Sequence, residues 1–165
     1  MFNHVKGNLL DSKCDYICHQ VNCQGVMGSG IAKQIRERWP EVYTSYRQLY
    51  DIDRYDGTYD LLNKIDIVQI HNDSRKVINI FSQQHYGYDG TRFTSYDAFD
   101  ICLRRIRNTI PKGSTIGFPK NIGCGLGGGN WKAISALIEE ILGEDFDVYI
   151  YEYDPEENIC LTLEK

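Results

Sequence analysis

Seven residues, Gly123-Cys124-Gly125-Leu126-Gly127-Gly128-Gly129, constrain the fold of this chain more than any other segment. They follow the apolar run Thr115–Pro119 and precede a helical pattern that starts near Trp131. Glycine permits a positive φ and a close approach of backbone N–H groups to an anion, and a helix N-terminus adds unpaired donors. Five glycines in seven residues at such a junction predict a phosphate-binding loop rather than a simple tight connection.

A further segment, Gln24-Gly25-Val26-Met27-Gly28-Ser29-Gly30, has the same context. It follows the apolar run Tyr16–Val21 and opens a helix predicted over Ile31–Trp39. We name residues 24–30 the first glycine loop and residues 123–129 the second glycine loop. Two such loops indicate a diphosphate held from two sides. The second glycine loop lacks the lysine and hydroxyl of a nucleotide-kinase P-loop, and it does not fit the dinucleotide-binding glycine pattern.

Strand and helix patterns alternate along the chain. Short apolar runs predict strands covered on both faces, over Asn3–Val5, Tyr16–Val21, Ile65–Ile70, Val77–Phe81, Thr115–Phe118 and Val148–Tyr153. Apolar spacings of three and four predict helices over Ile31–Trp39, Val42–Tyr50, Phe99–Ile110 and Trp131–Ile141. Asn130 and Gly143 are the expected caps of the last helix, and the acidic stretch Asp51–Asp60 is expected to be a loop.

This alternation predicts one α/β domain over residues 1–165, a three-layer α/β/α sandwich. Ligands of such sheets bind at the carboxyl ends of the strands, where both glycine loops lie. The net charge of −5 argues against a general nucleic-acid binder. No apolar run is long enough to span a membrane and no signal peptide is visible, so a cytoplasmic protein without membrane association is expected.

Candidate chemistry near the loops is limited. His19, inside a predicted strand, is either a hydrogen-bonded core histidine or a proton-transferring group beside a phosphate. Asn22 either bonds its own backbone in a turn or binds sugar hydroxyls. Cys23 and Cys124 have no visible base that would activate a thiol, so both are expected to pack. The six cysteines lack zinc spacing, and neither a metal nor a cofactor is expected.

Two long segments together resemble the macro domain family. They run from His19-Gln20-Val21-Asn22-Cys23 through Gly30-Ile31-Ala32 and from Phe118-Pro119-Lys120-Asn121-Ile122 through the second glycine loop to Asn130-Trp131. Val5–Leu10 and Val148–Tyr153 extend the resemblance to nearly the whole chain. Macro domains bind ADP-ribose on a mixed sheet between helices, so the resemblance implies this fold and this ligand, with a monomer expected.

The resemblance also implies a role for each part of the site. Asn8 lies where many members have an aspartate that accepts from the adenine amino group, and Tyr153 lies where an aromatic residue stacks near adenine. Asn22 would reach the distal ribose, which Ser82 and Gln83 would line. The full set of expected ligand contacts is Asn8, Leu9, Asn22, Gly28, Ser29, Gly30, Ile31, Ser82, Gln83, Pro119, Ile122, Gly123, Cys124, Gly125, Leu126, Gly127 and Tyr153.

Within the family, the chain is similar to the branch that contains the yeast-type ADP-ribose-1″-phosphate phosphatase and the terminal ADP-ribose protein glycohydrolase. The resemblance implies a phosphatase that converts ADP-ribose 1″-phosphate to ADP-ribose, with His19 as its catalytic residue. The alternatives are a hydrolase that removes ADP-ribose from protein or nucleic acid and a non-catalytic ADP-ribose reader. The glycohydrolase has a lysine and an aspartate where this chain has Gln83 and Gly127, so a lysine-dependent mechanism is not expected.

Overall fold

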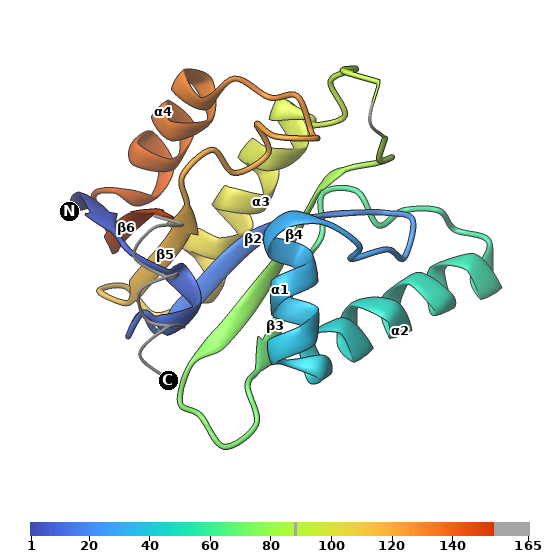
Figure 1. The fold of residues 1–165 in the computed structure, drawn as a ribbon, viewed down its shortest axis with the longest axis horizontal. Helices are drawn as coiled ribbons and strands as arrows, with labels where there is room; N and C mark the ends of the chain where they lie inside the picture. Colours follow the sequence, from blue (N-terminus) through green and yellow to red (C-terminus); the bar gives the residue numbers. More distant parts are fainter. Residues whose placement is uncertain (88, 154–165) are drawn as a thin grey trace, which may run out of the picture.

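A computed structural model describes residues 1–87 and 89–153 of the chain (Figure 1). Its central sheet has six strands in the order β1-β6-β5-β2-β4-β3. The strands are β1 (Phe2–Lys6), β2 (Tyr16–Asn22), β3 (Ile65–Gln69), β4 (Lys76–Gln83), β5 (Thr115–Pro119) and β6 (Asp147–Glu152). Neighbouring strands are parallel except for the β3–β4 pair. The predicted mixed sheet is therefore confirmed.

Helices cover both faces of this sheet (Figure 1). Helices α1 (Gly30–Arg38) and α2 (Pro40–Asp56) lie on one face, together with the short 3-10 helix η1 (Leu9–Asp11). Helices α3 (Tyr96–Thr109) and α4 (Trp131–Leu142) lie on the other. The three-layer α/β/α architecture of a macro domain is thus confirmed.

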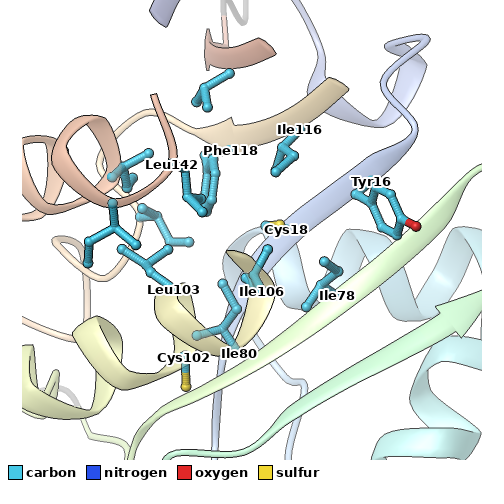
Figure 2. Close-up of a cluster of buried hydrophobic side chains, with 14 of the residues drawn as sticks. Tyr16, Cys18, Ile78, Ile80, Cys102, Leu103, Ile106, Ile116, Phe118 and Leu142 are labelled. Atoms are coloured by element: carbon cyan, nitrogen blue, oxygen red, sulfur yellow. The ribbon is translucent and has the colours of Figure 1, made fainter. Parts of the chain in front are cut away.

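The two cores follow from the pleat of the sheet, which sends successive side chains to opposite faces. On β2, Cys18 points into the α3–α4 core and Ile17 points into the α1–α2 core, and both are fully buried. Figure 2 shows the α3–α4 core, where Leu103 and Ile106 of α3 approach the sheet residue Ile80. Burial on both faces explains why the strands are apolar runs rather than alternating sequences.

Helix α2 runs further than its apolar pattern predicts, so the expected loop over Asp51–Asp60 is wrong for its first six residues. Arg47 pairs with Asp51 one turn along the helix, at 3.1 Å. The buried Asp53 carboxylate accepts from the Asp60 N–H at 2.8 Å, and Gly57 ends the helix with a φ of 69°. These acidic residues are therefore engaged in intramolecular contacts that a composition argument does not reveal.

Helix α4 has the caps that the sequence predicts. Asn130 Oδ1 accepts from the Ala133 N–H at 3.2 Å, and Gly143 is the C-cap, with a right-handed φ of −64°. Asn130 is therefore the single residue between the second glycine loop and the first residue of α4, Trp131. The first glycine loop follows β2 and leads into α1, and β2 and β5 are adjacent parallel strands. Both glycine loops consequently meet at one edge of the sheet.

Candidate functional site

A pocket of about 350 Å³ lies between the two glycine loops, within the usual size range of small-molecule sites. The ends of β2 and β4, the turn after β5 and the start of α1 complete its lining. Twelve of the expected ligand contacts line it: Asn22, Gly28, Ser29, Gly30, Ile31, Gln83, Pro119, Ile122, Gly123, Gly125, Leu126 and Gly127. The fold therefore brings most of the expected residues to one cavity.

The first glycine loop is held by side chains that reach it from β2 and α2. Asn22 Oδ1 accepts from the Gln24 N–H, and Asn22 Nδ2 donates to Val26 O, both at 2.9 Å. The buried Tyr46 hydroxyl accepts from the Val26 N–H at 3.0 Å and lies 2.8 Å from both oxygens of Asn22. Asn22 thus makes the backbone hydrogen bonds of a turn residue, which was one of its two predicted roles. One proton of its side-chain amide has no acceptor within the loop.

Two arginines of α2 hold carbonyl groups next to the first loop. Arg54 donates to Cys23 O at 3.0 Å, and Arg47 donates to Gly25 O at 3.3 Å. At the start of α1, the side chain of the N-cap Ser29 makes no capping hydrogen bond. Among the described residues, the N–H groups of 30–32 have no acceptor. The loop therefore has the carbonyl groups of Gly25 and Val26 occupied and presents unused donors at a helix N-terminus.

The second glycine loop is held through its own backbone. Gly123 O accepts from the Thr94 hydroxyl at 2.7 Å and from the Gly129 N–H at 2.8 Å. Gly127 O accepts from the N–H groups of Phe93 and Thr94 at 2.7 and 2.9 Å. Within 1–87 and 89–153, the N–H groups of residues 125–127 have no acceptor. Here too, carbonyl groups that flank the unused donors are occupied, those of Gly123 and Gly127.

Glycine is required in this loop for space. A Cβ at Gly127 would lie 2.5 Å from Thr94 Oγ1 and 2.7 Å from Gly123 O. Gly123 also has a φ of 73°, which side-chain-bearing residues rarely adopt. A Cβ at Gly125, in contrast, meets nothing within 4 Å. Gly125 is therefore the position at which a side chain alters the pocket without disturbing the loop.

The electrostatics of the pocket suit an anion. Lys120 is the cationic side chain in its lining and lies 3.5 Å from Glu152. No histidine, aspartate or glutamate belongs to the lining, and the described residues contain no His/Cys/Asp/Glu cluster able to hold a metal ion. The pocket therefore offers backbone donors and a cation rather than an acid–base pair.

His19, the expected catalytic residue, lies inside strand β2. His19 is fully buried and does not line the pocket. Its Nε2 lies 2.5 Å from Asn79 Oδ1, and Asn79 in turn donates to Asp66 at 3.3 Å. Burial lowers the pKa of His19 to about 4, so the imidazole is neutral near pH 7. The core interpretation of this histidine is the one that the geometry supports.

Five other expected contacts lie outside the pocket lining. Leu9 and Ser82 are buried, and the Ser82 hydroxyl donates within the protein, to Gln20 at 2.7 Å. Asn8 caps η1 through the Leu10 N–H and lines a separate cavity of about 480 Å³. Tyr153 is half exposed beyond β6, and burial raises the pKa of the half-buried Cys124 thiol.

The structure adds eight residues to the lining that the sequence interpretation missed: Gln20, Val21, Val26, Ala32, Tyr86, Gly87, Lys120 and Asn121. Gln20 was accessible to pattern reasoning, because it lies two residues before Asn22 on the strand that leads into the first glycine loop. Tyr86 and Gly87 lie in the connection after β4, which has no periodicity that would have revealed them.

No protein-family model matches the chain. A DNA ADP-ribosyl glycohydrolase of Mycobacterium tuberculosis is 28% identical over 153 residues, which is 92% of this chain. The chain spans 42% of the length of that relative. No helix among the described residues is long and apolar enough to cross a membrane.

Solved structures show the same architecture. A Bacteroides thetaiotaomicron protein of unknown function superimposes with a TM-score of 0.77 and 26% identity, covering 92% of this chain and 98% of its own. The macrodomain of Mycobacterium tuberculosis DarG gives a TM-score of 0.71 and 25% identity, covering 94% and 98%. The chain has the macro domain fold, and its relatives and structural neighbours support its place in the macro domain family.

Proposed function

We propose that this chain binds ADP-ribose in the pocket between the two glycine loops. The observation that carries the proposal is the pair of unused donor sets: residues 30–32 on one side and residues 125–127 on the other, with the carbonyls of Gly25, Gly123 and Gly127 bound within the protein. A diphosphate has oxygens on two sides and matches two donor sets better than a single phosphate does.

The proposed chemistry is hydrolysis of a bond at the distal ribose. In this proposal the diphosphate lies between the loops, and the distal ribose lies beside Asn22 and Gln83 at the ends of β2 and β4. Asn22 contributes its remaining amide proton to a ribose hydroxyl. Water forms the new C1″–O bond while the bond from C1″ to the substituent breaks, and the substituent takes up a proton.

DNA is the substituent that the comparisons favour, because the curated relative is named a DNA ADP-ribosyl glycohydrolase. The phosphate of ADP-ribose 1″-phosphate is the second candidate, favoured by the likeness of the His19–Ala32 pattern to the phosphatase. With His19 buried in the core, this second reaction loses its expected proton-transferring group. We therefore rank DNA de-ADP-ribosylation first.

The proposed hydrolysis proceeds by direct attack of water. Gln83 stands where the protein glycohydrolase has a lysine, and an amide nitrogen is not nucleophilic. Borohydride added during turnover is expected to trap no ADP-ribose adduct at Gln83. Lys120 is the amine in the pocket lining, and an adduct mapped to it by mass spectrometry would contradict the water mechanism.

One experiment separates the candidates. The pure protein is incubated with ADP-ribosylated DNA, ADP-ribosylated protein and ADP-ribose 1″-phosphate, and every product is assayed. Release of ADP-ribose from the DNA alone supports the first candidate, and release of phosphate alone supports the second. Binding of ADP-ribose without any turnover would make the chain a reader. Gly125→Glu serves as the control with a blocked pocket.

A further inference from the structure

The side-chain amide of Gln20, in the pocket lining, is occupied by the protein itself. Gln20 Nε2 donates to Gln83 Oε1 at 2.8 Å and to Thr94 Oγ1 at 3.0 Å. Gln20 Oε1 accepts from the Ser82 hydroxyl at 2.7 Å. Because an amide nitrogen carries two protons, Gln20 has no proton left to offer a ligand.

Two backbone carbonyls fix the direction of this network. Thr94 Oγ1 lies 2.7 Å from Gly123 O, and Gln83 Nε2 lies 2.6 Å from His85 O. A carbonyl oxygen only accepts, so the single proton of the Thr94 hydroxyl goes to Gly123 and the Gln83 oxygen faces Gln20. Gln20 must therefore be the donor to both neighbours.

The network ends on the second glycine loop at two points. Thr94 donates to Gly123 O through its hydroxyl and to Gly127 O through its N–H, at 2.7 and 2.9 Å. Both glycines also pack so closely that a Cβ on Gly123 or Gly127 would come within 3.1 Å of Thr94 Oγ1. Strand β2 and the segment before α3 thus set the orientation of the loop.

We infer that Gln20 and Thr94 are positioning residues for the anion-binding loop. Gln20 orients the Thr94 hydroxyl, and Thr94 keeps the carbonyls of Gly123 and Gly127 turned away from the bound anion. A carbonyl dipole turned toward a phosphate would repel it, whereas fixed N–H groups attract it without further reorganisation. This inference rests on the proposed function for the identity of the anion, which is the diphosphate of ADP-ribose.

The test replaces Thr94 in two ways. Thr94→Val keeps the shape and removes the hydroxyl, whereas Thr94→Ser keeps the hydroxyl. Thr109→Val is the matched control, because the Thr109 hydroxyl also donates to a carbonyl, that of Arg105, but at the exposed end of α3. Hydrogen exchange of the Gly129 amide, which donates to Gly123 O, is measured without ligand, and ADP-ribose affinity is measured by calorimetry.

In Thr94→Val we expect exchange at Gly129 to accelerate and ADP-ribose affinity to fall, each by about tenfold, since one hydrogen bond is lost. Thr94→Ser and Thr109→Val are expected to match the unmodified protein. Unchanged exchange and affinity in a folded Thr94→Val variant would overturn the inference, and so would an equal loss in Thr109→Val.

A second variant covers the case in which Thr94→Val does not fold. Gln20→Glu is nearly isosteric but replaces a two-proton donor with an acceptor, so the Thr94 hydroxyl is expected to turn away from Gly123 and exchange at Gly129 to accelerate. Unchanged exchange there would overturn the inference. The exchange measurement needs no ligand, so failure of the unmodified protein to bind ADP-ribose would refute the proposed function separately.

Discussion

The two glycine loops expose unused N–H donors by different means. In the first loop, side chains from β2 and α2 bind the backbone: Asn22 and Arg47 donate to the carbonyls of Val26 and Gly25, and the Tyr46 hydroxyl accepts from the Val26 N–H. In the second loop, backbone N–H groups and the Thr94 hydroxyl bind the carbonyls of Gly123 and Gly127, and close packing leaves no room for a Cβ at Gly127 or Gly129. The conformation of the first loop therefore depends on particular side chains outside it. The conformation of the second loop depends on glycine at its crowded positions.

Acid is expected to have the largest effect on the stability of the strand that leads into the first glycine loop. His19 lies on β2, the strand that leads into the first loop, and its pKa is about 4 in the fold against about 6.5 when unfolded. As the pH falls, the unfolded chain binds this proton before the folded chain does. The contribution of His19 to the free energy of unfolding is therefore fully present above pH 6.5 and is lost as the pH drops toward 4. We expect a loss of about 3 kcal/mol in unfolding free energy over this window.

Chemical denaturation at several pH values measures this loss. His19→Asn, which removes the titrating group, is expected to flatten the dependence between pH 6.5 and 4. If His19→Asn retained the full pH dependence, another buried group would be responsible. A folded His19 variant that loses turnover but not stability would restore a catalytic role.

A pair of alanine substitutions compares the glycines of the two loops. Gly127→Ala places a Cβ against Thr94 and the Gly123 carbonyl, so ADP-ribose affinity is expected to fall by about 100-fold. Gly30→Ala meets nothing within 4 Å and suffers only from a φ of 57°, so a loss of about fivefold is expected. Calorimetry measures the ADP-ribose affinity of both variants. Equal losses of affinity would show that the two loops do not differ in their need for glycine.

Removal of one hydroxyl tests the support of the first loop. Tyr46→Phe leaves the Val26 N–H and an oxygen of Asn22 without their partner, and we expect unfolding free energy to fall by about 2 kcal/mol. Tyr55→Phe, at a side chain that is 92% exposed, is the control and should have no effect. Thermal and denaturant unfolding measure both variants, and a Tyr46→Phe variant as stable as the control would show that Tyr46 does not support the loop.

Much of the fold was predictable because its signals are local. The strand–glycine–helix junctions, the apolar runs and the Asn130 cap are visible in short windows of sequence. The extension of α2 through Asp56 was not, because its support comes from ion pairs and from the buried Asp53, which a count of acidic residues cannot distinguish from a solvated loop.

The site was predictable where backbone geometry defines it and not where side-chain direction does. Glycines 123, 125 and 127 come to the pocket because the strand before them ends there. His19 and Gln20 are neighbours on β2, yet the pleat sends them to opposite faces, His19 into the core and Gln20 toward Thr94. Which of two adjacent residues faces a ligand depends on the register of the whole sheet.

Calorimetry with ADP-ribose on the unmodified protein and on Gly125→Glu tests the central claim most directly. A side chain at Gly125 meets open space in the pocket lining, so the fold is expected to remain intact while a carboxylate repels the diphosphate. We predict one site in the unmodified protein, an affinity reduced by about 100-fold in Gly125→Glu, and no change in Ala136→Glu, which adds the same charge on the exposed face of α4. Undiminished affinity in a folded Gly125→Glu variant, or no binding by the unmodified protein, would contradict the claim.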